Sequence, residues 1–102
     1  MIIVIGSAIA APGQENAVRD LSLIHVARSR AEPGCTAHNV SVDSENPSRF
    51  VFVEYWQDMA ALKAHFALKA SQDFVRDLAP LLAAKPEMKI FAAEPVSPTS
   101  PE

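Results

Sequence analysis

The stretch that decides the fold is "RFVFVEYW", residues 49–56. It is rich in aromatic and β-branched residues and contains no turn residue, so it predicts a buried β-strand. Successive side chains of a strand point to opposite faces. Apart from Glu54, both faces of this strand are apolar: Phe50, Phe52 and Trp56 lie on one, and Val51, Val53 and Tyr55 on the other.

Three further stretches predict the other strands of the sheet. They are "MIIVIGSAIAA" at residues 1–11, "CTAHNVSV" at 35–42 and "KPEMKIFAAEP" at 85–95. In the first, the large residues Ile3, Ile5 and Ile9 alternate with small ones. Both of its faces are therefore largely apolar, and the small face leaves space.

Two segments have helical periodicity. Residues 14–32 repeat apolar side chains at Ala17, Leu21, Ile24, Ala27 and Ala31, and "EPG" ends this helix. Asp58 is a candidate cap for a second helix, whose stripe runs through Met59, Leu62, Phe66 and Ala70 and, after a kink near Ser71, through Phe74, Leu78, Leu81 and Leu82. The order β-α-β-β-α-β predicts an α+β, ferredoxin-like fold, with two helices on one face of an antiparallel sheet.

The face of the sheet away from the helices remains to be covered. An antiparallel sheet in a monomer can leave one face polar, but here the second face is apolar and too large a patch for a soluble monomer. We therefore expect two sheets to pack face to face in a homodimer, as a dimeric α+β barrel.

Size and composition restrict the other possibilities. The 102 residues suit one domain, expected at 1–96 and followed by a flexible C-terminal tail at 97–102. A net charge of −3 without a basic cluster disfavours a nucleic-acid partner. The single cysteine cannot form an internal disulfide, and it leaves a structural zinc site without a thiolate cluster. No signal peptide or membrane span is expected, so the predicted location is cytoplasmic.

Four segments resemble one known family. "SRAEPGC" (29–35), "RFVFVEYW" (49–56), "AALKAHF" (60–66) and "LAPLLAAKPEMKIFAAEPV" (78–96) are similar to the antibiotic biosynthesis monooxygenase (ABM) domain. The resemblance implies a small dimeric α+β barrel, and the family includes cofactor-independent quinol monooxygenases. It also includes haem degraders and an isomerase of a phosphorylated signalling sugar derivative.

The resemblance also implies a pocket between the sheet and the helices. Trp56 matches a family Trp at the end of the third strand, and Arg76 in "FVRDL" matches a family Arg. Phe52 and Leu62 replace a family Asn and a family Tyr, and His38 replaces a Tyr that follows "EPGC" in quinol-type members. The haem-degrading branch needs an Asn late in the first strand, where this chain has Gly6, Ser7 and Ala8.

These residues predict a catalytic site, although some of them also have a structural interpretation. His65 or His38 would be the catalytic base, with Trp56 against the substrate and Arg76 attracting its anion. The predicted substrate-binding residues are Phe50, Phe52, Glu54, Leu62 and Phe66. Core packing of Trp56, a structural salt bridge of Glu54 and surface ion pairs of Arg76 with Asp73 and Asp77 remain the alternatives. His25, off the helical stripe, is expected at the surface, and Cys35 is expected to be a small hydrophobic residue after a turn.

Several functions are compatible with such a site. The first is a cofactor-independent monooxygenase that oxidises a phenolic or quinol-type molecule with O2, because no nucleotide loop or metal-spacing motif is present. The second is a non-catalytic ligand-binding or stress-response barrel. An isomerase of a small phosphorylated dione is the third, and it needs a cationic phosphate site, for which Arg76 is the obvious candidate.

Overall fold

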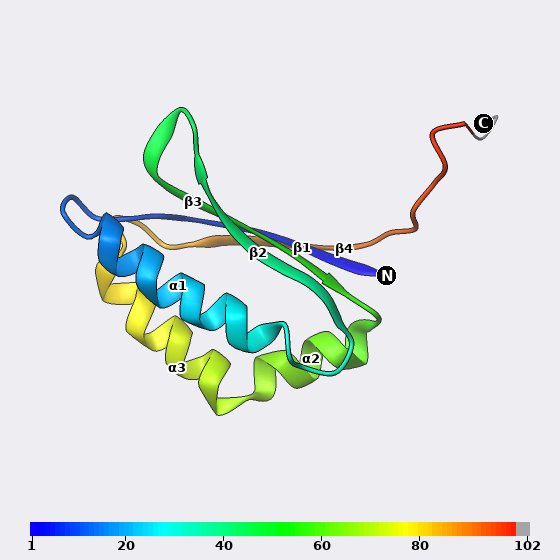
Figure 1. Ribbon diagram of the computed structural model, residues 1–102. Helices are drawn as coiled ribbons and strands as arrows, with labels where there is room; N and C mark the ends of the chain where they lie inside the picture. The colour runs from blue at the N-terminus through cyan, green and yellow to red at the C-terminus, as the bar shows by residue number, and fades with distance from the viewer. Residues whose placement is uncertain (100–102) are drawn as a thin grey trace.

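The computed structural model describes residues 1–99 and has the predicted order of elements. Figure 1 shows a single sheet with all helices on one side of it. The elements are β1 (Ile2–Ile9), α1 (Glu15–Ser29), β2 (Cys35–Asp43), β3 (Asn46–Trp56), α2 (Met59–Ala67), α3 (Lys69–Leu78), the 3₁₀ turn η1 (Ala79–Leu81) and β4 (Glu87–Ala92).

The sheet is antiparallel throughout, in the order β2-β3-β1-β4. The strand β3 lies between β1 and β2, as its two apolar faces predicted. Its register places Phe52 opposite Gly6 and Val53 opposite Ile5. This arrangement confirms the α+β, ferredoxin-like fold.

Burial along β3 follows the predicted alternation. Phe50, Phe52, Glu54 and Trp56 are buried on the helix side, whereas Tyr55 on the opposite side is 38% exposed. In β1 the buried residues are the even-numbered ones, and Ile5 points the other way and is 45% exposed. No segment of residues 1–99 covers this outer face (Figure 1).

The predicted apolar stripe of α1 is wrong. The helix instead buries Val18, Ser22, His25, Val26 and Ser29, while Ile24 is 63% exposed. The buried face is small and polar, and the Ser29 hydroxyl is satisfied inside the helix because it donates to the carbonyl of His25 at 2.7 Å. Hydropathy alone does not indicate such a face.

The second helical segment breaks three residues before the predicted kink. Leu68 is extended, with ψ 136°, and separates α2 from α3. Asp58 caps α2 as predicted, because its side chain accepts the backbone N–H of Ala61 at 2.9 Å. The break brings the Ser71 hydroxyl to 3.3 Å from Nδ1 of His65.

The chain after η1 contains a shorter strand than predicted. The last strand is shorter than residues 85–95 and ends at Ala92. The predicted tail at 97–102 lies partly outside the described residues. Within residues 1–99, no helix combines the length and hydropathy that a membrane span requires.

Candidate active site

A pocket of about 310 Å³ lies between β3 and the three helices. Its floor is polar, because it contains His25, Glu54, His65 and Ser71, and its sides are apolar. The full lining is His25, Phe52, Glu54, His65, Phe66, Ser71, Gln72, Phe74, Val75 and Met88. A small molecule with an apolar body and one polar end fits this distribution.

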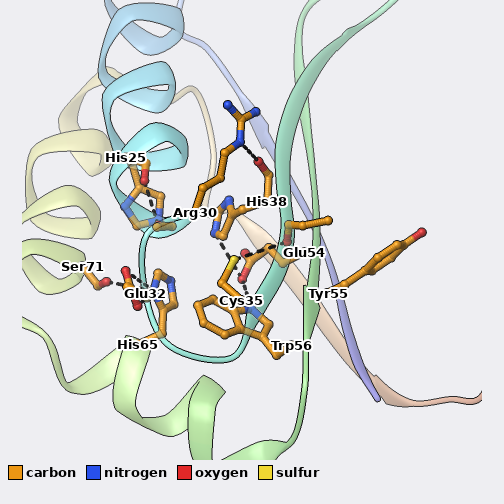
Figure 2. A network of polar contacts seen from close by, with 12 residues as sticks. His25, Arg30, Glu32, Cys35, His38, Glu54, Tyr55, Trp56, His65 and Ser71 are labelled. Carbon is orange, nitrogen blue, oxygen red and sulfur yellow. Dashed lines mark hydrogen bonds and ion pairs between the residues drawn. The ribbon is translucent and has the colours of Figure 1, made fainter.

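The three histidines of the chain lie close together here, His25 and His65 in the pocket lining and His38 behind it (Figure 2). His25 comes from α1, His38 from β2 and His65 from α2, and each is at most 5% exposed. Their ring centroids are 5.3 to 5.5 Å apart. The prediction that His25 lies at the surface is therefore wrong.

His65 is held by Glu32, from the turn after α1. Nδ1 of His65 lies 2.8 and 3.1 Å from the two carboxylate oxygens of Glu32. A carboxylate only accepts hydrogen bonds, so Nδ1 carries the proton and the Nε2 lone pair of a neutral ring remains free. This arrangement suits a general base.

The turn "EPG" explains how Glu32 reaches His65. Gly34 has φ +82°, and a Cβ at this position would lie 2.5 Å from Cβ of Ala61 in α2. Only glycine allows the turn both this conformation and this approach to the helix. The turn is visible in the sequence, but the role of its glutamate is not.

The partner of His25 is a cation, whereas the partner of His65 is an anion. Nη2 of Arg28 lies 2.8 Å from Nδ1 of His25. Burial first, then the neighbouring His38, His65 and Arg28, lower the pKa of His25 to about 3. The ring is therefore neutral near pH 7.

Glu54 is an anion at the floor of the pocket. Its Oε1 accepts the indole N–H of Trp56 at 2.9 Å and lies 3.3 Å from Nε2 of His38. The His38 contact is close but poorly aligned, and neither ring nitrogen of His38 hydrogen-bonds to another described residue. Burial raises the pKa of Glu54, but His38 and the Trp56 N–H together outweigh burial and hold this pKa below its ordinary value.

The predicted site residues separate into three groups: those that line the pocket, those buried behind the lining, and Arg76, which lies outside. Phe52, Glu54, His65 and Phe66 line the pocket. The others on the helix side lie behind this lining and are buried in the core or beneath Glu54: Phe50, Leu62, Trp56 and His38.

Arg76 lies apart from both groups. Its side chain is 66% exposed on the outside of α3, and it pairs with Asp73 and Asp77 at 3.0 Å. These are the surface ion pairs of the alternative interpretation. The structure therefore does not bring Arg76 to the pocket.

The residues that the sequence analysis missed are His25, Arg28, Glu32 and Phe74. One signal could have found His25. Its face of α1 repeats at Val18, Ser22, His25, Val26 and Ser29, which is helical spacing if serine is counted as a small buried residue.

Cys35 lies next to this site but is not arranged as a nucleophile. The side chain is half-buried. Burial first, and then the carboxylates of Glu32 and Glu54, raise its pKa, so the thiol form is favoured. This agrees with its predicted role as a small residue after the turn.

The three rings are also close enough to consider a metal ion. One nitrogen from each lies within 4.8 Å of one from each of the others. A tetrahedral ion with Zn–N bonds of about 2.0–2.1 Å needs nitrogens about 3.4 Å apart. Arg28 also donates to Nδ1 of His25, so the proton of this neutral ring is on Nε2 and no lone pair remains for an ion. The arrangement suits hydrogen bonding to a ligand better than coordination of an ion.

Comparison with known proteins agrees with this architecture. The family model of antibiotic biosynthesis monooxygenase matches residues 1–77. The uncharacterized protein sll1783 of Synechocystis is 33% identical over 90 residues, which are 88% of this chain and 61% of that protein. The chain thus spans about three fifths of the length of this curated relative.

Solved structures are similar over most of the chain. The crystal structure of an antibiotic biosynthesis monooxygenase has a TM-score of 0.86 and 30% identity, and the match covers 93% of this chain and 100% of the other. A Deinococcus radiodurans protein has a TM-score of 0.91 and 24% identity, with 99% and 100% covered. A Pseudomonas aeruginosa protein, PA3566, has a TM-score of 0.83 and 29% identity, with 92% and 94% covered.

Proposed function

Because the chain belongs to the antibiotic biosynthesis monooxygenase family, we propose that it is a monooxygenase. It oxidises a phenolic or quinol-type small molecule with O2 and uses no bound cofactor. One observation carries this proposal: an imidazole backed by a carboxylate, His65 with Glu32, lies at the floor of a pocket with aromatic sides.

The pocket residues can each take a part in such a reaction. The aromatic ring of the substrate lies among Phe52, Phe66 and Phe74, with a hydroxyl group at the polar floor. Nε2 of His65 removes the hydroxyl proton, and Glu32 stabilises the imidazolium that results. His25, Glu54 and His65 are each at most 6% exposed, so an anion held at this floor has little contact with water.

The substrate itself can supply the electrons that O2 needs. A hydroquinone and O2 together contain the atoms of a hydroxyquinone and one water molecule. The ring is oxidised, one oxygen atom forms the new C–O bond, and the other leaves as water with two hydrogens from the substrate. The protein then only binds the ring, moves a proton and stabilises an anion.

Oxygen uptake tests this proposal. We expect the protein, with a chelator and no flavin, to consume O2 with a menadiol-type hydroquinone faster than the spontaneous reaction. His65→Ala should lose this rate, while the exposed control Glu45→Gln should keep it. An unchanged rate in His65→Ala, or a reaction that requires added flavin or metal, would contradict the proposal.

A ligand-binding barrel is the second candidate, and the apolar sides of the pocket favour it. Thermal stabilisation by small aromatic ligands without O2 uptake would support this candidate. The phosphorylated dione is less suitable. Among the described residues no Lys or Arg lines the pocket, and Arg76 lies outside it.

We also propose that the protein forms a homodimer through the outer face of its sheet. This face carries Ile5 next to Val53, with Tyr55 further along β3. Two such faces can pack together about a two-fold axis and bury more than about 1,200 Å². Light scattering should give the mass of a dimer, and Val53→Lys should produce monomer or unfolded protein. A folded, dimeric Val53→Lys would show that another surface is used.

A further inference from the structure

We infer that His25 is a second catalytic residue, a fixed N–H donor that stabilises the substrate anion, and that Arg28 is its positioning residue. The inference rests on the proposed function, because it assigns the group that faces the anion formed when His65 removes the proton. It gives His25 and Arg28 the role that the sequence predicted for Arg76.

The first step is the tautomer of His25. A guanidinium has only donors, so in the 2.8 Å contact Arg28 donates and Nδ1 of His25 accepts. The single proton of a neutral imidazole must then be on Nε2. The same Nη2 of Arg28 also donates to the backbone carbonyl of Ala70 at 3.1 Å, which holds the guanidinium in place.

The second step is the position of the ring. His25 lines the pocket, and it also lines the neighbouring hollow that contains Arg28. The imidazole thus separates the guanidinium from the pocket. The ring stacks on Phe74, with centroids 3.9 Å apart and planes within 3°, so its plane is fixed. No hydrogen bond to another residue of 1–99 engages its Nε2–H, which leaves this donor free for a ligand.

The third step is the charge around the ring. The groups that face it are Arg28 on α1, His38 on β2, Glu54 on β3 and His65 on α2. Burial and the basic neighbours keep His25 neutral, so it donates without adding a positive charge that would repel a protonated His65. The guanidinium behind the ring polarises the N–H toward the pocket. A preorganised donor in a site of low dielectric constant stabilises a developing anion.

Ionisation of a bound phenol tests the inference without turnover. The probe is 4-nitrophenol, whose phenolate is read by its absorbance across a pH series. We expect the ionisation constant of the bound phenol to be about tenfold or more larger in the wild type than in His25→Phe. Phenylalanine keeps the stacking on Phe74 and removes the N–H. His25→Gln, whose amide has an N–H, should recover part of the effect.

Kinetics give a second readout. With menadiol, His25→Phe should lower kcat by about 10²-fold and change KM only a few-fold, as expected for a donor used mainly in the transition state. Arg28→Met leaves the ring intact. Like His25→Phe, it should lower the ionisation constant of bound 4-nitrophenol. Circular dichroism checks that each variant is folded, and Glu45→Gln is the matched surface control.

Two results would overturn the inference. One is equal ionisation of 4-nitrophenol in the wild type, His25→Phe and Arg28→Met. The other is failure of 4-nitrophenol to bind at the wild-type pocket. If ionisation depends on His25 but no variant or wild type oxidises menadiol, the donor role stands and the proposed oxidation fails.

Discussion

His25 and His65 face the same pocket with ring centroids 5.3 Å apart, yet their partners have opposite charges. Arg28 donates to Nδ1 of His25, whereas Glu32 accepts from Nδ1 of His65. The free Nε2 is therefore a donor in the first ring and an acceptor in the second. The partner on Nδ1, and not the residue type, therefore decides whether Nε2 of a buried histidine donates or accepts a hydrogen bond.

The two pairs also differ in how the chain assembles them. Arg28 follows His25 by three residues on α1, so one turn of helix makes the contact. Glu32 and His65 are 33 residues apart and meet only because the turn at Gly34 packs against α2. The His25–Arg28 pair is local, whereas the His65–Glu32 pair depends on the tertiary fold.

The largest expected effect is loss of the base. His65→Gln should lower the rate of menadiol oxidation by about 10²- to 10⁴-fold, because a glutamine amide cannot take the proton. The binding of 4-nitrophenol should remain. A rate within a few-fold of the wild type would show that His65 is not the base.

The next effect separates the two partners. Glu32→Gln keeps an oxygen that can accept from Nδ1 but removes the charge that stabilises the imidazolium, so kcat should fall by about 10²-fold. Arg28→Met should cost only about tenfold, because part of the population of His25 keeps the donor tautomer. Steady-state kinetics on both variants decide this. A larger loss in Arg28→Met than in Glu32→Gln would show that the donor pair dominates.

The sequence revealed the fold better than the site for a physical reason. The strand β3 shows its two faces in the alternation of Phe50, Val51, Phe52 and Val53, because packing on both sides requires apolar side chains. The buried face of α1 contains serines and a histidine, and the hydrogen bonds of the Ser29 hydroxyl and of His25 Nδ1 are not recorded by hydropathy.

The site residues follow the same division. Of the predicted substrate-binding residues, Phe52, Glu54 and Phe66 line the pocket, whereas Phe50 and Leu62 are buried in the core. Glu32 could not be predicted as the partner of His65, because nothing local in the sequence links two residues that meet through a turn. Arg76 was placed by resemblance, and its local acidic neighbours hold it at the surface.

The last expected effect is on stability and concerns His25 alone. Its pKa in the folded state, about 3, lies below the ordinary value of 6.5, so the unfolded chain binds a proton that the folded chain does not. The contribution of His25 to stability is therefore fully present above pH 6.5 and is lost as the pH falls toward 3. At pH 5 the loss is about 2 kcal/mol relative to pH 7.5.

Urea unfolding at pH 7.5 and pH 5 checks this effect in the wild type and in His25→Gln. The variant should lose less stability between the two pH values, by about the same 2 kcal/mol. This range lies above the ordinary pKa of Glu54, so that its carboxyl stays mostly ionised. An equal loss in both proteins would show that His25 titrates normally.

Two neighbouring histidines present opposite groups to one pocket, and the tautomers of their rings can be measured. Long-range ¹H–¹⁵N correlation spectra of the metal-free protein near pH 7 distinguish protonated from unprotonated ring nitrogens. We expect a proton on Nε2 and none on Nδ1 for His25, and a proton on Nδ1 for His65. A His25 ring protonated at Nδ1, or the same tautomer in both rings, would contradict it.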